Sequence, residues 1–241
     1  MKPMSRRALI TSGLAAAGVA GFAAANRIAG KHGLIPPDCR GVYGAGETLT
    51  YAAHRLLTRD AMAREFPRNM ISKNPFANEV APPSDQFKKL QAGGFGDWRL
   101  TIDGMVAHPM SLSLADLRSL PTHSQITEVV CEEGWSYVAE WIGTPLSGVL
   151  REAGVLPQAR YLKYFSIQPE WSDSIDMADA HHPQTFLTLG MNDGELPVGF
   201  GGPLRLRVPR QLGYKSVKYI TRITATDSMK FQGDYAWFAG I

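Results

Sequence analysis

Alternating apolar and polar positions predict a series of short strands from residue 98 onward. Residues 98–102 alternate in this way and end at a turn formed by Asp103 and Gly104, which is typical of a strand. Further strands are predicted over residues 124–130, 161–167, 186–189, 204–208 and 219–226. The strand over residues 124–130 leads directly into Cys131, so we expect it to deliver that side chain to a site in a loop.

Apolar positions at helical spacing predict one long helix and three short ones. The long helix covers residues 49–66, with Thr48 as its N-cap and Pro67 as its end. The short helices are residues 114–120 capped by Ser113, a segment between Thr144-Pro145 and Gly154, and residues 176–180. Because these strands and helices do not alternate regularly, the expected fold class is α+β with mixed sheets.

The chain divides into four predicted segments. Residues 1–25 form an export signal, residues 26–96 an N-terminal arm with one helix, residues 97–226 the main domain and residues 227–241 a tail. Glycine and proline make residues 26–47 an extended linker and residues 67–96 mostly loop. The tail carries aromatic side chains that we expect to pack on the core, namely Phe231, Tyr235, Trp237 and Phe238.

The first segment has the features of a twin-arginine export signal. Ser5, Arg6 and Arg7 precede an apolar stretch over residues 9–25, rich in glycine and alanine, that ends in three alanines. This pattern predicts cleavage near Ala25 and a periplasmic location. A retained membrane anchor is the alternative, although the stretch is short and only weakly hydrophobic for a permanent span.

The charge balance gives no reason to expect a nucleic-acid partner. The formal net charge is +3, from 25 basic and 22 acidic residues. Residues 1–25 hold three of the basic residues and no acidic residue, so the rest of the chain has 25 − 3 = 22 basic and 22 acidic residues. Cys39 and Cys131 are the two cysteines, and either one disulfide or two free thiols fits this count.

Three short segments are candidates for binding or catalysis. Cys131 offers a soft thiolate ligand for a redox metal, although a lone cysteine is also commonly a small buried hydrophobe. A glycine cluster, which lets backbone approach a ligand closely, precedes Arg205 and Arg207. We expect these two arginines to point to opposite faces of the strand, so that one contacts an anion and the other points elsewhere. Ser216 and Lys218 can grip a phosphate, if they share the face of a strand.

Other polar pairs are weaker candidates. His181 and His182 are adjacent, and neighbouring side chains on regular structure diverge, so at most one is expected to face a site. Glu132 and Glu133 can do acid–base work, but their spacing alone does not indicate it. The sequence contains no Gly-x-Ser-x-Gly element of a serine hydrolase.

Several motifs follow one another in a distinctive order. They are Cys131-Glu132-Glu133-Gly134-Trp135-Ser136, Trp141-Ile142-Gly143-Thr144-Pro145-Leu146, His182-Pro183, Gly190-Met191, Gly202-Pro203-Leu204-Arg205-Leu206, Val208-Pro209 and Gly213-Tyr214-Lys215-Ser216-Val217-Lys218. Over residues 97–226 this order resembles the oxidoreductase molybdopterin-binding domain of the sulfite-oxidase superfamily. It is most similar to the haem-free bacterial branch that includes the periplasmic methionine-sulfoxide reductases. The resemblance implies a sulfite-oxidase-like fold behind an N-terminal extension.

The resemblance also implies a site. A molybdenum atom would be held by one pyranopterin dithiolene and by Cys131, the metal ligand and catalytic residue. Cofactor contacts are implied at Asn74, Ala77, Asn78, Cys131, Ser166, Phe200, Arg205, Ser216, Val217 and Lys218. Phe200 departs from the pattern, since the reductases have a cofactor-contacting asparagine there. One polar cofactor contact is therefore lost or supplied elsewhere.

The implied activity is two-electron oxygen-atom transfer on a small-molecule or protein-bound oxo substrate. Glu132, Glu133 and Trp135 beside the expected metal favour a neutral sulfoxide or N-oxide over the sulfite dianion. The sequence has no haem, flavin or iron–sulfur motif, so a separate electron partner is expected, for which a membrane haem protein is the candidate. Three alternatives stay open: a sulfite dehydrogenase, an enzyme with Cys131 as nucleophile, and a non-catalytic binding module on the same fold.

Overall fold

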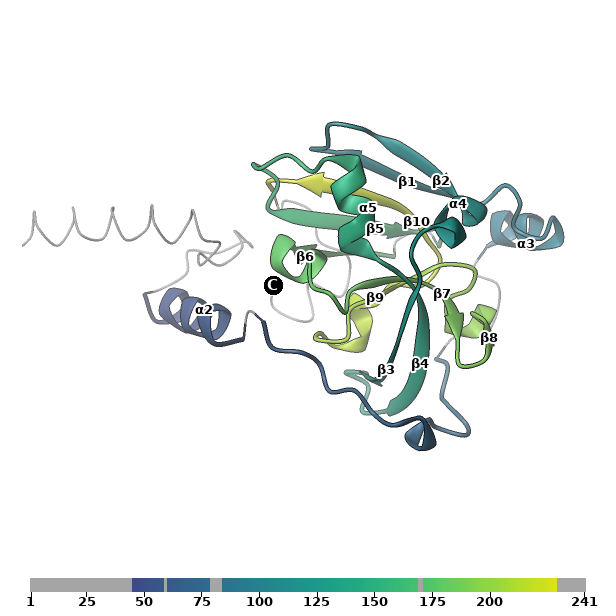
Figure 1. The fold of residues 1–241 in the computed structure, drawn as a ribbon, viewed down its shortest axis with the longest axis horizontal. Helices are drawn as coiled ribbons and strands as arrows, with labels where there is room; N and C mark the ends of the chain where they lie inside the picture. The colour runs from purple at the N-terminus through teal and green to yellow at the C-terminus, as the bar shows by residue number, and fades with distance from the viewer. Residues whose placement is uncertain (1–44, 59, 79–83, 169–170, 229–241) are drawn as a thin grey trace, which may run out of the picture. The chain divides into compact units, whose positions relative to one another are not determined.

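The computed structural model describes residues 45–58, 60–78, 84–168 and 171–228 (Figure 1). They belong to two compact units, residues 1–61 and residues 62–241. The predicted export signal, most of the linker and the aromatic residues of the tail lie outside the described residues. No helix in the described ranges combines the length and the apolar character needed to cross a bilayer.

The first unit contains helix α2 (Ala45–Thr58). The expected helix over residues 49–66 is wrong at both ends, because α2 begins before Thr48 and ends well before Pro67. Residues 62–66 are extended instead. The N–H of Phe66 donates to the carbonyl oxygen of Ile126 (2.9 Å), which a continuing helix would not allow.

The second unit is built on two sheets, and Figure 1 shows one in its upper part and the other in its lower part. The strands of the first sheet are, in spatial order, β2 (Met110–Ser113), β1 (Arg99–Gly104), β10 (Ile220–Thr226), β5 (Tyr161–Ser166) and β6 (Ser172–Asp176). β1 and β10 are parallel, and the other pairs are antiparallel. The first strand of the main domain therefore pairs with the last.

The second sheet carries the strand that precedes Cys131. Its strands are, in spatial order, β3 (His123–Val130), β4 (Ser136–Pro145), β7 (Phe186–Met191) and β8 (Gly194–Glu195), and β9 (Arg205–Arg207) pairs with β7. All of these pairs are antiparallel. This combination of mixed sheets and short helices confirms the predicted α+β class.

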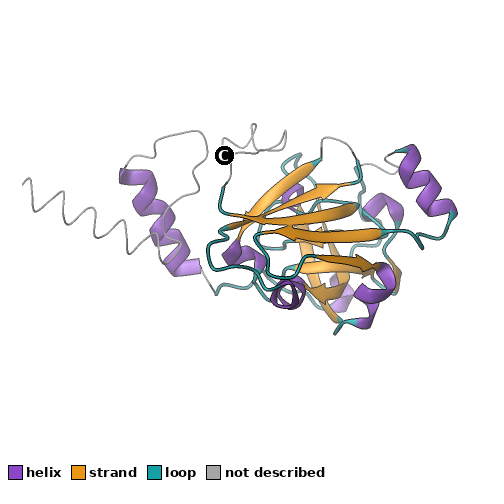
Figure 2. Ribbon diagram, turned by 90° about the horizontal axis from the view of Figure 1, so that it is seen from above, coloured by secondary structure: helices purple, strands orange, loops and turns teal. Residues whose placement is uncertain are grey.

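Short helices surround the sheets, as Figure 2 shows. They are the α-helices α3 (Asp85–Ala92), α4 (Leu114–Ser119), α5 (Leu146–Ala153) and α6 (Met177–Ala180), and the 3-10 turns η1 (Arg68–Met70), η2 (Val198–Phe200) and η3 (Gly213–Lys215). Ser113 caps α4 in a capping box with Asp116, and Gly154 ends α5 with a φ of 65°. Both caps were predicted. The expectation of mostly loop over residues 67–96 is wrong at α3, which Ser84 caps by accepting from the N–H of Phe87.

The chain between residues 62 and 78 runs along the second sheet toward the site. Gln184, which is buried, donates to the carbonyl oxygen of Ala63 (3.0 Å) and accepts from its N–H (2.7 Å). Farther along, the N–H of Ser72 donates to the carbonyl oxygen of Val138 (3.0 Å), and Ser72 Oγ accepts from the N–H of Val138 (3.0 Å). This arm is thus fastened at two places before it reaches Asn78.

Candidate active site

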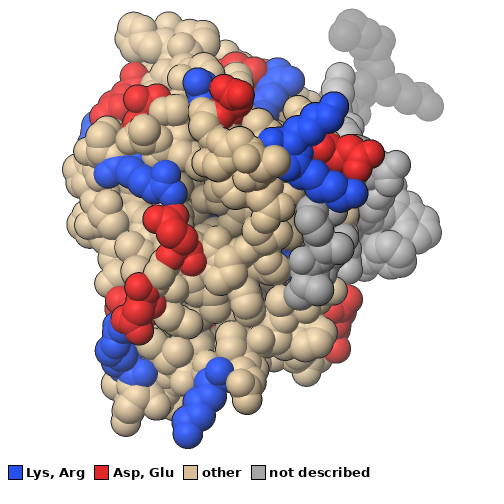
Figure 3. Space-filling model, turned by 90° about the vertical axis from the view of Figure 1, so that its right-hand side faces the viewer, with Lys and Arg blue, Asp and Glu red and all other residues tan. Residues whose placement is uncertain are grey.

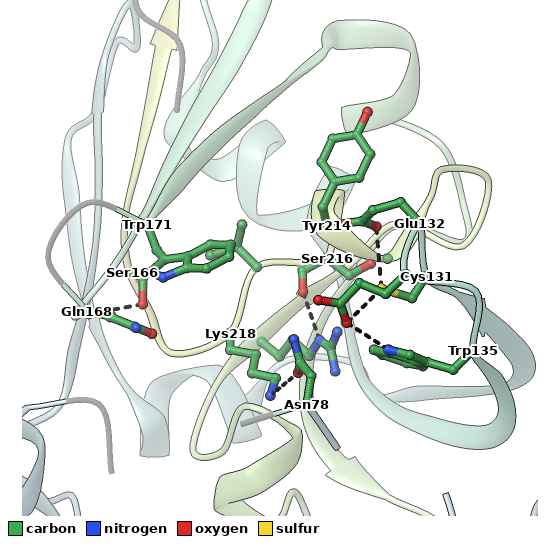
Figure 4. Close-up of a pocket in the computed structure, with 14 residues that line it drawn as sticks. Asn78, Cys131, Glu132, Trp135, Ser166, Gln168, Trp171, Tyr214, Ser216 and Lys218 are labelled. Atoms are coloured by element: carbon green, nitrogen blue, oxygen red, sulfur yellow. Dashed lines mark hydrogen bonds between the residues drawn. The ribbon is translucent and has the colours of Figure 1, made fainter. Parts of the chain in front are cut away.

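A pocket opens where the two sheets meet, with about 620 Å³ of empty space that continues into solvent (Figure 4). Its walls come from the end of the arm, the turn after β3, the β5–β6 connection, strand β9 and the segment leading into β10. The lining residues are Asn78, Cys131, Glu132, Glu133, Trp135, Ser166, Gln168, Trp171, Arg205, Gly213, Tyr214, Ser216, Val217 and Lys218.

Cys131 lies directly after β3 and lines the pocket. A tight turn follows it, because its N–H donates to the carbonyl oxygen of Trp135 (2.9 Å) and its carbonyl oxygen accepts from the N–H of Gly134 (3.1 Å). Gly134 has a φ of 90°, a conformation that favours glycine. The sulfur lies 3.5 Å from Glu132 Oε2 and 3.8 Å from Glu133 Oε2. The strand delivers a single thiol to the pocket, as the sequence predicted.

Burial raises the pKa of the Cys131 thiol to about 11. The N–H of Glu133 opposes this rise, whereas the carboxylates of Glu132 and Glu133 add to it. The thiol is therefore protonated at neutral pH, unlike the low-pKa cysteine of a thiol-dependent enzyme. A metal that binds here must displace the proton, since the thiolate is the form that ligates.

In cofactor-free protein, we expect iodoacetamide to alkylate Cys131 slowly near neutral pH and about tenfold faster for each added pH unit up to about pH 10. Only the thiolate reacts, and below the pKa its fraction grows in that proportion. Mass spectrometry of the Cys131 peptide gives the rate, with a free cysteine peptide as reference. A rate that levels off below about pH 8 would reveal a low-pKa thiol and favour the nucleophile alternative.

Arg205 and Arg207 both turn toward Trp141 and Ser216. Arg205 Nε donates to the carbonyl oxygen of Ser216 (2.9 Å), and Arg207 Nη1 donates to Ser216 Oγ (3.1 Å). The two guanidinium carbons lie 5.4 and 5.2 Å from the centre of the Trp141 ring. The expectation that the two arginines would diverge is wrong, because residues two apart in a strand lie on the same face.

The segment from Gly213 to Lys218 begins as the 3-10 turn η3 and is not a strand, so the condition for Ser216 and Lys218 to share a strand face is not met. Lys215 points away from the pocket and is buried, and its Nζ donates to Asp173 Oδ1 (2.6 Å) and to the carbonyl oxygen of Ser174 (3.0 Å). This ion pair fastens η3 to β6. Ser216, Val217 and Lys218 then follow into the pocket.

The glycine cluster before β9 lies against other parts of the chain and does not line the pocket. Gly201 has a φ of 107°, and a Cβ there would come within 3.1 Å of Arg205 Cδ and 3.0 Å of Lys218 Cγ. A Cβ on Gly202 would lie 2.0 Å from the carbonyl oxygen of Leu196. These glycines therefore let neighbouring parts of the chain approach closely. Gly201 leaves room for the side chains of Arg205 and Lys218, which line the pocket.

Aromatic rings stand beside Cys131 at the mouth of the pocket. Trp135 Nε1 donates to Glu133 Oε2 (2.8 Å), and the Trp135 ring stacks on Tyr137 (centroids 5.9 Å apart) and contacts Phe76 (5.1 Å). Figure 4 shows Trp171 across the pocket from Trp135, carried by the β5–β6 connection. No sequence pattern pointed to Trp171, because the β5–β6 connection has no motif.

Seven of the ten predicted cofactor-contacting residues line this pocket: Asn78, Cys131, Ser166, Arg205, Ser216, Val217 and Lys218. Asn74, Ala77 and Phe200 do not. The Phe200 ring lies edge-on to Tyr137 (5.6 Å), and its carbonyl oxygen accepts from Arg205 Nη1 (3.0 Å). Contact of the seven with a cofactor stays a prediction. Pocket residues that sequence reasoning did not select include Gln168, Trp171 and Tyr214.

The adjacent histidines diverge, as expected. His182 is buried and its Nδ1 accepts from the N–H of Gln184 (3.3 Å), whereas His181 is exposed. Neither lines the pocket. In the part of the chain that the structure describes, no three His, Cys, Asp or Glu side chains are grouped so that they could hold a metal ion.

The charges of the pocket fit an anionic pterin cofactor. Arg205 is 4% exposed and Arg207 fully buried, and no ion pair within the described ranges involves either. Buried positive charge without a carboxylate partner is costly unless an anion balances it. In this arrangement Cys131 would hold the metal, and Arg205, Ser216 and Lys218 would hold the phosphate end of the pterin.

Comparisons with known proteins identify the type of domain. Residues 88–234 match the family model described as oxidoreductase molybdopterin binding domain. A protein of Azospira oryzae, provisionally named protein-methionine-sulfoxide reductase subunit YedZ1, is 36% identical over 190 residues, or 77% of this chain and 70% of that protein. The protein-methionine-sulfoxide reductase catalytic subunit MsrP of Ralstonia nicotianae is 32% identical over 145 residues, or 54% of this chain and 44% of that protein. The chain spans about half the length of this and similar MsrP proteins.

A solved structure shows the same type of fold. The sulfane dehydrogenase SoxCD from Paracoccus pantotrophus superposes with a TM-score of 0.54 at 22% identity, covering 70% of this chain and 46% of that chain. At this identity the likeness concerns the sulfite-oxidase-like fold alone. The family model, in contrast, matches more than half of the sequence. The chain therefore belongs to the oxidoreductase molybdopterin-binding domain family, whose members are molybdopterin-dependent oxidoreductases.

Proposed function

We propose that this chain is the catalytic part of an exported enzyme that reduces a neutral sulfoxide, with methionine sulfoxide as the first candidate. The observation that carries this proposal is the chemistry beside Cys131, where two carboxylates and an indole stand within the pocket. Relatives named as catalytic subunits of protein-methionine-sulfoxide reductases support it.

The charges beside Cys131 favour a neutral oxo substrate over the sulfite dianion. Glu132 and Glu133 place carboxylate oxygens within 4 Å of the Cys131 sulfur, at 3.5 and 3.8 Å. A dianion next to these groups is repelled, whereas the dipole of a sulfoxide is not. Arg205, the arginine that lines the pocket, directs Nε and Nη1 to main-chain carbonyl oxygens. The aromatic ring of Trp135 offers an apolar surface to a thioether side chain.

The proposed reaction converts a sulfoxide, two electrons and two protons into a thioether and water. The molybdenum–pterin group supplies two-electron oxygen-atom transfer when it is bound. The chain ligates the metal through Cys131 Sγ and holds the pterin. Glu132 and Glu133 are the carboxyl groups next to that sulfur and can carry the protons. The indole N–H of Trp135 fixes the orientation of Glu133 Oε2.

We propose that a separate membrane haem protein supplies the electrons. The sequence carries no haem, flavin or cluster motif.

On the face drawn in Figure 3, cationic and anionic side chains are interspersed, which gives no support to a nucleic-acid partner.

We further propose that the protein is exported to the periplasm by the twin-arginine route. Ser5-Arg6-Arg7 and the apolar stretch up to Ala25 support this. Wild type is expected in the periplasmic fraction of cells, and the double variant Arg6→Lys/Arg7→Lys in the cytoplasm. Equal periplasmic amounts of both would contradict the route.

Enzyme purified from a pterin-competent host is expected to oxidise reduced viologen with methionine sulfoxide and to leave cytochrome c oxidised when sulfite is added. The double variant Glu132→Gln/Glu133→Gln removes the two negative charges at nearly constant shape. We expect it to bind sulfite, as a competitive inhibitor of sulfoxide reduction, about tenfold or more tightly than wild type does. Sulfite-dependent reduction of cytochrome c without sulfoxide turnover would replace this proposal by a sulfite dehydrogenase.

A further inference from the structure

Arg207 is a buried cation that stands behind the pocket. Its side chain is fully buried, and none of the ion pairs in the described ranges includes it. Its Nε has no hydrogen-bond partner among the described residues. A cation in such a place costs stability. An apolar side chain would fill the same space with a smaller loss of stability. The contacts of the guanidinium therefore indicate its function.

The guanidinium of Arg207 links β9 with the strand that leads to Cys131. Its Nη2 donates to the carbonyl oxygen of Glu128, on β3. Its Nη1 donates to Ser216 Oγ (3.1 Å), and the Trp141 ring lies 5.2 Å from its central carbon. Three contacts in different directions leave the guanidinium a single orientation. Ser216 is therefore held by a rigid donor.

The hydroxyl of Ser216 has its acceptor capacity filled. A serine oxygen has two lone pairs and one hydrogen. Arg207 Nη1 and the N–H of Val208 both donate to Ser216 Oγ, each at 3.1 Å. The hydroxyl hydrogen must then point away from both donors, and within the described ranges no hydrogen bond from it to an acceptor is formed. Since Ser216 lines the pocket, a ligand oxygen there can accept this hydrogen.

We propose that Arg207 is a positioning residue of the cofactor site, which fixes Ser216 so that its hydroxyl donates into the pocket, to a phosphate oxygen of the pterin. A donor polarised by a cation makes a stronger hydrogen bond to an anion than an unassisted hydroxyl does. The proposal rests on the cofactor and not on the substrate, so a failed sulfoxide assay leaves it untouched.

The test is a double-mutant cycle on cofactor binding, with no substrate present. Cofactor-free wild type, Arg207→Gln, Ser216→Ala and the double variant are titrated with the purified molybdenum–pterin cofactor, and bound pterin is measured by fluorescence. Each single variant is expected to bind about tenfold or more weakly. Because Arg207 acts through Ser216, the double variant should lose clearly less than the product of the two single losses. Losses that multiply, or wild-type affinity in Arg207→Gln, would overturn the proposal.

Two further variants separate positioning from a general need for a buried arginine. Arg207→Lys keeps the cation and a donor, so it should recover part of the affinity, and it replaces Arg207→Gln in the cycle if that variant does not fold. Arg210→Gln is the matched control, since Arg210 pairs with buried Asp179 (3.5 Å) and does not line the pocket. It should bind the cofactor as wild type does. An equal loss of affinity in Arg210→Gln would refute a specific role for Arg207.

Discussion

Cys131→Ser is expected to abolish oxygen-atom transfer and to leave the protein with an altered or empty metal site. Serine offers a hard oxygen in place of the soft sulfur that lies at the end of β3, and its hydroxyl loses a proton to a metal far less readily than a thiol does. Wild type should contain about one molybdenum atom per chain, by analogy with a site that offers one protein ligand. Metal analysis and viologen-coupled sulfoxide reduction, on both proteins from the same pterin-competent host, provide the comparison.

The outcome is specific to residue 131 only if another thiol can be removed without effect. Cys39→Ser is the control, and we expect it to retain both metal and activity. Unchanged circular dichroism of Cys131→Ser would show that the fold persists, as expected for the exchange of one small side chain for another. A Cys131→Ser protein that is fully loaded with metal and turns over at the wild-type rate would exclude Cys131 as the ligand.

Lys215→Met is expected to destabilise the protein by about 3–5 kcal/mol. The substitution leaves the buried carboxylate of Asp173 without the ammonium that now lies 2.6 Å from it. Urea unfolding of cofactor-free protein measures the loss. Asp173→Asn/Lys215→Met should recover much of it, because the double variant leaves no buried charge. Lys88→Met, which breaks an exposed pair with Asp85, is the control and should unfold as wild type does.

The loss in Lys215→Met should also depend on pH. Burial already raises the pKa of Asp173, and Lys215 opposes that rise, so its removal raises the pKa of Asp173 further. A folded-state pKa above the unfolded value of about 3.9 means that the folded protein binds more protons. The stability of the variant relative to wild type should therefore fall as pH rises from about 4 to 7. A deficit that stays constant over this range would show that the carboxyl is not responsible.

The sequence predicts the elements of the main domain where they depend on residues that are close together in the chain. Ser113 defines a helix end through its hydroxyl, and Thr144-Pro145 and Gly154 do so through their backbone geometry; the structure confirms all three. The alternation of apolar and polar residues likewise predicts the strand that ends before Cys131. β4 has no clear alternation, because pairing with β3 on one edge and β7 on the other buries most of its residues, so it was missed. The helix over residues 49–66 was overextended, since the contact of Phe66 with Ile126 is a long-range effect.

The sequence predicts those residues of the candidate site that lie in recognisable motifs. Cys131, Arg205 and the segment from Ser216 to Lys218 lie in recognisable motifs and line one pocket. Trp171 sits in a connection without a motif, and only the pairing of β5 with β6 brings it there. Phe200 was placed by position in a motif, yet its ring packs on Tyr137. A match to a motif thus predicts the position of the backbone better than it predicts the direction of a side chain.

The hydrogen bond between Lys218 and Asn78 joins residues 140 positions apart. Asn78 and Lys218 both line the pocket, so the pocket is complete only after residue 218 has been synthesised and folded. Completion of the pocket also depends on long-range strand pairing, which is slow by nature. A chain cut short before Ser216 would lack the last three residues of the pocket wall, Ser216, Val217 and Lys218.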